Sequence, residues 1–390
     1  MADGDPPVKK QKLEIKDKNL HLFERCKKHK DTLCIALKEL ETWNLFGFCF
    51  VRLEQCNAAF SCCFTQAWCA TLRHVEDEDV DEKNKKLVYF GSVLDVDVLK
   101  NFLNNQSKIS KEQAKALEKL ADSLDNIQEI NKVLKEELEN SDQSEVRWAV
   151  VCASHLLTSL AITNQMTVSD TGSPARFHQC PCASGCKKPI RVGDTSIGHK
   201  DVWHGSVDIL LGPVAIVTSP EQELFAEGIS TFELKMGNLE VGRHQLIAET
   251  IVFSHAQNSL GYKLGLVPTI ALSKDRVKVF MYDPNKDLLY ESVELPLFDD
   301  RNLSVSTVVA LWLAINYIHF EAHVPASHTE FGYTANFRKA LHDDKKMEIY
   351  RNKIRIGGCK QPSRTKPNLM GFSYGKLGWL DVKRKDDEVK

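Results

Sequence analysis

Apolar residues along this chain change their spacing at several points, and each spacing predicts a different kind of element. Between residues 107 and 140, apolar positions alternate at intervals of three and four, which is the period of a long amphipathic helix. The polar side chain of Asn131 occupies the one remaining position of this apolar seam. The other seam residues are Leu117, Leu120, Leu124, Ile127, Leu134 and Leu138.

The predicted helix at 107–140 fits two kinds of packing. Its seam lasts only about three heptads, a length that suits packing against the same chain as well as pairing with a second helix. We therefore keep two alternatives, packing in cis and self-association or protein binding through this helix.

The segment before this helix predicts a disordered tail and then a small domain. Residues 1–18 are rich in charge and contain two adjacent prolines, which favours disorder. Lys9, Lys10 and Lys12 form a short basic cluster in this tail, as in a weak nuclear-import signal. Residues 19–106 combine a helical opening with apolar, aromatic-rich runs, a pattern typical of a small α+β domain.

Residues 141–322 alternate between helical and strand patterns, which predicts an α/β core. The order is helix, three strands, helix and strand, followed by two further strands and a last helix. The predicted helices cover 146–162, 243–258 and 305–320, and the predicted strands cover 202–211, 214–218, 229–236, 266–272, 277–282 and 288–293. Residues 323–390 are expected to form a basic C-terminal extension.

Composition narrows the class of protein. The chain has 390 residues, 43% of them hydrophobic, which suits packed cores. Its apolar runs are too short or too interrupted to span a bilayer, and its start does not resemble a signal peptide. We therefore expect an intracellular protein, in the nucleus or the cytoplasm, that does not bind membranes and keeps its twelve cysteines reduced.

A formal net charge of −2 means that nucleic-acid binding would require a local basic patch. Residues 336–376 hold eleven lysines or arginines against three acids. The aromatic residues interspersed there could stack on bases, although a solvated basic tail fits equally well. These aromatic residues are Phe337, Tyr350, Phe372 and Tyr374.

Three charged residues interrupt predicted apolar strands. Asp208 lies within HGSVDILLG, and Glu233 and Lys235 lie within TFELKMG. A charge in a buried strand is costly unless something pairs with it. Because side chains alternate along a strand, Glu233 and Lys235 share one face. If the strands are neighbours, the three groups converge.

Such a cluster suits hydrolysis of phosphodiester bonds. Two carboxylates can hold Mg²⁺ or Mn²⁺ together with phosphate oxygens, while a lysine assists the attacking water. Gln245 falls in the first turn of the next helix, where backbone N–H groups favour a phosphate, and Glu249 lies one turn further. His204 is a candidate for the lining of the same pocket.

In these residues the chain resembles the PD-(D/E)XK, or restriction-endonuclease-like, nuclease superfamily. The resemblance consists of Asp208 in a G-x-x-D strand, the E-x-K tripeptide at 233–235, a helix that opens with Gln245, and the order of elements. It implies that Asp208 and Glu233 bind the metal, that Lys235 is the catalytic lysine and that Gln245 positions substrate or water. A helical acid before the first strand assists in many members, and Glu145 is its counterpart here.

Three other interpretations remain open. Glu221, after Pro220, could replace Asp208 as the first acid, although its surroundings predict a loop. Glu233 and Lys235 could instead form a cross-strand ion pair on a solvated face. The core could also be a catalytically inactive nuclease fold that binds nucleic acid or protein.

A loop between the predicted helix and strands carries a separate set of metal-binding residue types. Its sequence HQCPCASGC holds His178, Cys180, Cys182 and Cys186, but C-x-C-x3-C is not the paired C-x2-C spacing of common zinc sites. We favour exposed thiols over zinc here, and we expect no closed tetrahedral site unless His178 or another ligand completes it.

Overall fold

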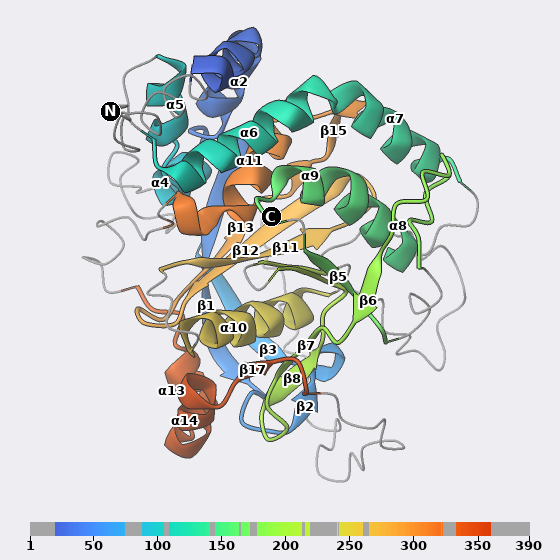
Figure 1. Ribbon diagram of the computed structural model, residues 1–390. Helices are drawn as coiled ribbons and strands as arrows, with labels where there is room; N and C mark the ends of the chain where they lie inside the picture. The colour runs from blue at the N-terminus through green and yellow to red at the C-terminus, as the bar shows by residue number, and fades with distance from the viewer. Residues whose placement is uncertain are drawn as a thin grey trace, which may run out of the picture. The chain divides into compact units, whose positions relative to one another are not determined.

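The computed structural model contains a mixed sheet of eleven described strands, which come from widely separated parts of the sequence (Figure 1). Its main path is β3-β1-β13-β12-β11-β10-β9-β5-β6, while β14 pairs with β12 and β4 pairs with β1. The bounds are β3 (Cys69–His74), β1 (Gly47–Cys56), β13 (Leu288–Ser292), β12 (Arg276–Asp283), β11 (Val267–Leu272), β10 (Ala215–Thr218), β9 (Ile209–Leu211), β5 (Met166–Ser169), β6 (Arg191–Gly193), β14 (Leu295–Pro296) and β4 (Val88–Tyr89).

The structure describes most of the chain but not all of it. Every described residue belongs to one compact unit that covers residues 1–360. The described residues are 20–74, 88–104, 109–140, 145–163, 165–171, 178–212, 215–218, 240, 242–259, 265–320, 322 and 333–359.

The central strands are buried on both faces, as their nearly continuous apolar sequences predict. Every residue of β11 and β13 is buried, although β13 includes the charged Glu291. Helix α10 (Arg243–Ser259) packs on one side of the sheet, and most other helices gather on the opposite side (Figure 1). The parallel pair β10 and β11 is joined through α10, which makes a strand–helix–strand crossover.

The other helices either precede β5 or follow β13 in the sequence. Their bounds are α2 (Lys30–Glu39), α3 (Trp43–Phe46), η1 (Phe64–Gln66), α4 (Phe90–Val93), α5 (Asp97–Leu103), α6 (Lys111–Asp125), α7 (Ile127–Leu138), α8 (Glu145–Cys152), η3 (Ala153–Leu157), α9 (Thr158–Leu160), α11 (Val305–Ile315), η5 (Tyr317–His319), α13 (Phe337–Leu341) and α14 (Asp344–Asn352).

Two smaller sheets complete the described strands. A four-stranded sheet has the order β17-β7-β8-β2, and β15 pairs with β16. The bounds are β17 (Arg355–Ile356), β7 (Ser196–Gly198), β8 (Trp203–Ser206), β2 (Cys62–Cys63), β15 (Phe298–Asp299) and β16 (Asn302–Leu303).

The mixed α/β class is confirmed, but the separate small domain at 19–106 is not seen. Strand β1 pairs with β13, so the segment 47–74 extends the same sheet as the predicted core. Part of the C-terminal extension also belongs to this unit, since β17 pairs with β7. Phe337 and Tyr350 are fully buried, so they do not present rings for stacking on bases.

The predicted helix at 107–140 is two helices instead of one. The break falls at Asn126, whose backbone leaves the helical region and whose side-chain amide donates to the Asp122 carbonyl at 2.8 Å. Asparagine competes for backbone groups in this way, which is why it favours helix ends. The seam packs in cis, since Leu117, Leu120 and Leu134 are fully buried within the chain.

The predicted strand at 202–211 is also divided, into β8 and β9 of two different sheets. Thr195 exchanges bonds with Val207: its hydroxyl donates to the Val207 carbonyl at 2.5 Å and its carbonyl accepts from the Val207 N–H at 3.4 Å. The Asp208 carbonyl accepts from the Ser169 N–H at 2.8 Å. The chain thus changes partners from β7 to β5 at Asp208.

The remaining predicted helices and strands agree with the structure to within a few residues, except for the strand at 229–236, which lies outside the described residues. The predicted helix at 146–162 corresponds to α8, η3 and α9, with a π-helical turn at η3. Within the described parts of the chain, no helix combines the length and apolar character needed to cross a membrane.

The polar position in the α7 seam has a partner on the same chain. The Asn131 side-chain oxygen accepts from the buried Leu303 N–H at 3.1 Å, and its amide donates to the Asn302 side chain at 3.2 Å. A leucine at this position would complete the apolar seam but would leave the Leu303 N–H without its acceptor.

We predict that Asn131→Leu lowers the free energy of unfolding by about 1–3 kcal/mol, the cost of an unsatisfied buried donor. Chemical denaturation measures it, and Lys132→Leu on the exposed face of the same helix is the control. If the seam paired between two chains, leucine would instead stabilise the protein and increase its oligomer size.

Candidate metal centre

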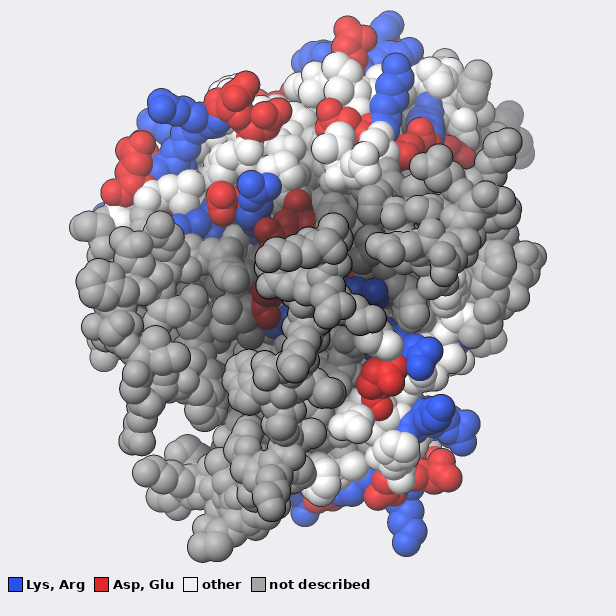
Figure 2. Space-filling model, turned by 180° about the vertical axis from the view of Figure 1, so that it is seen from behind, with Lys and Arg blue, Asp and Glu red and all other residues white. Residues whose placement is uncertain are grey.

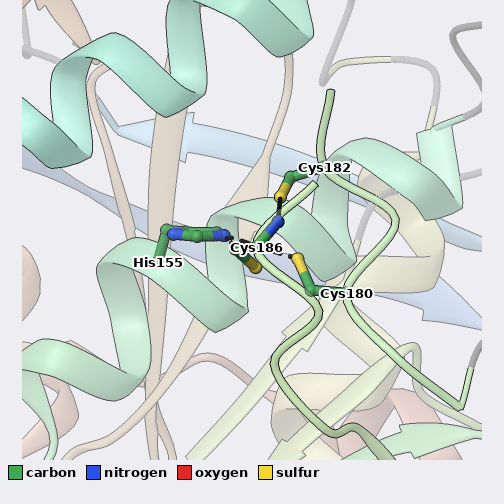
Figure 3. Close-up of side chains that lie close together, drawn as sticks. All are labelled: His155, Cys180, Cys182 and Cys186. Carbon is green, nitrogen blue, oxygen red and sulfur yellow. Dashed lines mark hydrogen bonds between the residues drawn. The ribbon is translucent and has the colours of Figure 1, made fainter. Parts of the chain in front are cut away.

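Three cysteines of one loop and a histidine of the preceding helical segment meet at a single point. Their ligand atoms, the sulfurs of Cys180, Cys182 and Cys186 and a ring nitrogen of His155, all lie within 4.8 Å of one another (Figure 3). Within the described residues, this is the one group of three or more His, Cys, Asp or Glu side chains placed to hold a metal ion.

The spacing of these atoms fits a tetrahedral zinc ion. The Nε2 atom of His155 lies 3.4 Å from the sulfur of Cys180 and 3.4 Å from that of Cys186. Zinc bonds of about 2.3 Å to sulfur and about 2.0 Å to nitrogen place tetrahedral sulfur and nitrogen ligands about 3.5 Å apart. Three sulfurs and one imidazole match the soft preference of zinc and differ from the oxygen ligands of Mg²⁺.

The cysteine loop is folded tightly by its own backbone. The Cys180 N–H donates to the Lys188 carbonyl at 2.7 Å, and the Ile190 N–H donates to the His178 carbonyl at 3.1 Å, which closes the loop at its base. A turn at its tip has Gly185 at φ +64°, a conformation that glycine adopts without strain. The tip thereby brings Cys182 and Cys186 together.

Backbone N–H groups in this turn point at the sulfur ligands. The Cys186 N–H donates to the Cys182 sulfur at 3.4 Å, and the Lys188 N–H donates to the Cys186 sulfur at 3.5 Å. Such bonds favour thiolate over thiol, because the charged sulfur is the better acceptor. The loop is therefore arranged for anionic sulfur ligands.

The protonation states also fit a metal site. Burial of the imidazole, with Lys188 nearby, lowers the pKa of His155 to about 4, so the ring is neutral at physiological pH, as a metal ligand must be. Burial raises the pKa of Cys180 to about 12. A bound metal dication offsets that cost because it deprotonates a coordinating thiol.

Cys182 behaves differently from Cys180. Burial alone would raise the pKa of Cys182, but hydrogen bonds from the Ser184 hydroxyl and from Cys186 lower it overall. The Ser184 oxygen lies 3.1 Å from the Cys182 sulfur. Cys182 is thus more easily ionised than Cys180 before a metal binds.

A buried ion pair fixes the cysteine loop to the helices. Glu137 of α7 accepts from the Ala183 N–H at 2.9 Å and pairs with Arg147 of α8 at 2.5 Å. The Glu137 side chain is only 2% exposed. Ala183 lies between Cys182 and Cys186. The Glu137 carboxylate therefore holds the cysteine loop against the helices next to the segment that carries His155.

The fourth ligand type in the cluster comes from His155 and not from His178, the histidine that the loop sequence suggested. His178 is exposed and does not belong to the cluster, whereas His155 lies in the π-helical turn η3, upstream of the loop. The preference for exposed thiols was wrong, since Cys180 and Cys182 are buried. A signal was present in the sequence: His155 is a single polar ring within the apolar run AVVCASHLL.

The structure describes only part of the predicted nuclease cluster. Asp208 is half-buried at the junction of β8 and β9. Glu233, Lys235 and the alternative acid Glu221 lie outside the described residues, so their proximity to Asp208 stays a prediction.

The accessory residues of that prediction are separated over several elements. Gln245 lies in the first turn of α10, as predicted, and its amide donates to the fully buried Glu249 at 2.8 Å. His204 is buried in β8, where its Nδ1 lies 2.8 Å from the Val202 carbonyl. Glu145 begins α8, and its side chain lies outside the description.

Comparisons of this chain with protein-family models, with curated proteins and with solved structures find no match. Functional inference therefore depends on the chemistry of the residues themselves.

We predict that Glu137→Gln lowers the free energy of unfolding by roughly 2–4 kcal/mol, somewhat less than for a fully buried pair because Arg147 retains contact with solvent. It should also weaken zinc binding by about 10- to 100-fold, since it loosens the support of a ligand loop. Denaturation and competition with a chromophoric chelator measure the two effects.

The control is Glu136→Gln, which removes the same charge from the next residue of α7, where the side chain is 39% exposed. Unchanged zinc affinity in Glu137→Gln would contradict the role of Glu137 in holding the loop.

Proposed function

We propose that this chain binds one zinc ion through His155, Cys180, Cys182 and Cys186. The observation that carries the proposal is the convergence of three sulfurs and one imidazole nitrogen within 4.8 Å. Four protein ligands fill a tetrahedral shell and leave no open position for water or substrate. The role that fits a closed shell is structural.

The proposed zinc would link a helical segment to a later loop, two parts of the unit that are not adjacent in the sequence. His155 lies between α8 and α9, and the three cysteines precede β6 at the end of the main sheet. The ion would tie this sheet end to the helices. Parallel pairing of β5 with β6, which Thr167 and Arg191 begin, would be stabilised as a result.

We predict one zinc per chain by elemental analysis of protein purified under reducing conditions. Cys186→Ser and His155→Ala should each lose the metal. Removal of zinc should lower the free energy of unfolding by about 3 kcal/mol relative to protein kept at a free zinc concentration near 100 times Kd.

Cys63→Ser is the matched control because Cys63 is an exposed cysteine outside the cluster. It should keep both zinc and stability. Protein that contains no zinc and takes up none from micromolar zinc chloride would contradict the proposal.

We propose hydrolysis of nucleic-acid phosphodiester bonds as a second function, with Asp208 and Glu233 binding Mg²⁺ or Mn²⁺ and Lys235 assisting the attacking water. The favouring observation is that α10 follows the E-x-K segment, presents Gln245 in its first turn and leads into β11. The nuclease resemblance implies a helix and a strand in this order after the E-x-K strand, which itself lies outside the described residues. A nuclease-like core without activity is the alternative on the same residues.

We predict that the full chain cleaves a single-stranded or duplex oligonucleotide when Mg²⁺ or Mn²⁺ is added, and that Asp208→Asn and Lys235→Ala each reduce the rate by about 100-fold or more. EDTA would also remove zinc, so activity is compared with and without added Mg²⁺. Zinc content and thermal midpoint are measured for each variant.

Asp201→Asn serves as the control, because this half-exposed carboxylate lies just before β8 and outside the predicted cluster. Cleavage retained by Asp208→Asn and Lys235→Ala would remove these residues from the mechanism. Absence of cleavage by the wild-type chain would leave the inactive alternative.

A further inference from the structure

A cluster of charged side chains, separate from the metal centre, lies on the face of the main sheet that α10 covers. Lys278 of β12 and Glu291 of β13 are charged residues in otherwise largely apolar strands, and their side chains are only 5% and 3% exposed. The Lys278 amine donates to the Glu291 carboxylate at 2.9 Å. Burial of both charges is tolerated only where each has close partners.

The strand register gathers two arginines around Glu291. Arg73 of β3 lies opposite Val51, and Glu291 lies opposite Cys49, two residues away on β1, so Arg73 and Glu291 share one face of the sheet. The guanidinium of Arg73 contacts the Glu291 carboxylate at 2.8 Å.

The second arginine comes from the start of α10. Nε of Arg243 donates to Glu291 at 2.8 Å, and Nη1 donates to the Thr71 hydroxyl at 2.5 Å. Its Nη2 is buried and lies 2.8 Å from Glu291, yet it makes no hydrogen bond of acceptable geometry to any described group. Arg243 therefore has donor capacity left within the cluster.

A fifth residue, Glu240, joins the cluster from its solvent side. One nitrogen of Arg73 contacts both Glu240 carboxylate oxygens, at 2.7 and 2.5 Å, and the Lys278 amine contacts one of them at 2.6 Å. The Glu240 side chain is 41% exposed, so the cluster reaches solvent there. A small anion held by an arginine and a lysine is the arrangement with which proteins bind phosphate.

The balance of charge identifies the class of anion. Arg73, Arg243 and Lys278 carry three positive charges against the one negative charge of the buried Glu291. Without Glu240 these four residues would keep two positive charges. Glu294 also lies 4.0 Å from the Lys278 amine, but its side chain is 38% exposed, so solvent screens its charge. A phosphate group carries about −1.5 to −2 at neutral pH and would neutralise the two positive charges, whereas a carboxylate leaves one.

We propose that Arg73 and Lys278 bind a phosphate group at the position that the Glu240 carboxylate fills in this structure, with Arg243 adding positive charge nearby and Glu291 holding the three cations in place. The proposal depends on neither zinc binding nor hydrolysis. On the face shown in Figure 2, basic and acidic side chains of the described residues are interspersed.

The charge of Glu240 at neutral pH supports its proposed role as the anion that occupies the site in this structure. Burial would raise the pKa of Glu240, but hydrogen bonds from Lys278 and Arg73 lower it overall, so the carboxylate is charged at neutral pH. An incoming phosphate must therefore compete with it, and its removal should strengthen phosphate binding.

The test titrates the full chain by calorimetry with inorganic phosphate, thymidine 5′-monophosphate, a dinucleotide with no terminal phosphate, and acetate. Glu240→Gln should bind inorganic phosphate about 10-fold more tightly than the wild type, because it removes the competing charge. The matched control is Glu294→Gln, which removes a carboxylate 4.0 Å from the Lys278 amine at nearly the same exposure. It should change the affinity by less than about threefold.

A double variant, Arg73→Lys with Glu240→Gln, keeps the charge but loses the arginine fork, and should lose most of the gain. Phosphate should also raise the thermal midpoint of Glu240→Gln more than that of Glu294→Gln, which shows binding to folded protein. Tighter binding of the nucleotide or the dinucleotide than of inorganic phosphate identifies the source of the phosphate group.

Equal phosphate affinity in Glu240→Gln and Glu294→Gln overturns the proposal, since a general charge effect would then explain it. Acetate bound as tightly as phosphate also overturns it. If Glu240→Gln does not fold, the phosphate affinities of Arg73→Lys and the wild type are compared instead. Equal affinities in these two proteins also overturn the proposal.

Discussion

The antiparallel pairing of β1 with β13 is the contact on which most of this unit depends. It brings Phe48 opposite Ser292, residues far apart in the sequence, and so attaches the N-terminal strands to the central sheet. Closing so long a loop costs entropy that only extensive burial can offset. The pairing also places Arg73 beside Glu291, so Arg73 joins the charge cluster only because this pairing forms.

The elements set by local pattern were predicted well, and those set by long-range contacts were not. Helix α10 and strands β11 to β13 follow from apolar runs of helical and strand length. The break falls at Asn126, within a seam that keeps its period on both sides, so spacing alone did not reveal it. The division at Asp208 follows from a change of strand partner, from β7 to β5, which no local pattern records.

The candidate sites show the same limit. Three ligands of the metal centre lie within one short loop and were recognised, while the fourth, His155, comes from an earlier helical segment and was missed. A charge in an apolar strand led to Asp208, and the same reasoning applies to Lys278 and Glu291. Their partners Arg73 and Arg243 are brought close only by tertiary structure, so the sequence could suggest the charges but not the cluster.

The buried charges also bear on which fold the chain adopts. Side chains alternate along β13, so a shift of one residue against β1 would move Glu291 to the opposite face of the sheet, where Phe48 and Tyr290 now pack. There the carboxylate would lose Arg73, Arg243 and Lys278 and would lie among aromatic rings, at a cost of several kcal/mol. The apolar residues of β13 would tolerate such a shift far better, since both faces of this strand are buried. Glu291 therefore fixes a register that hydrophobic burial alone leaves weakly determined, and the same register assembles the cations of the proposed phosphate site.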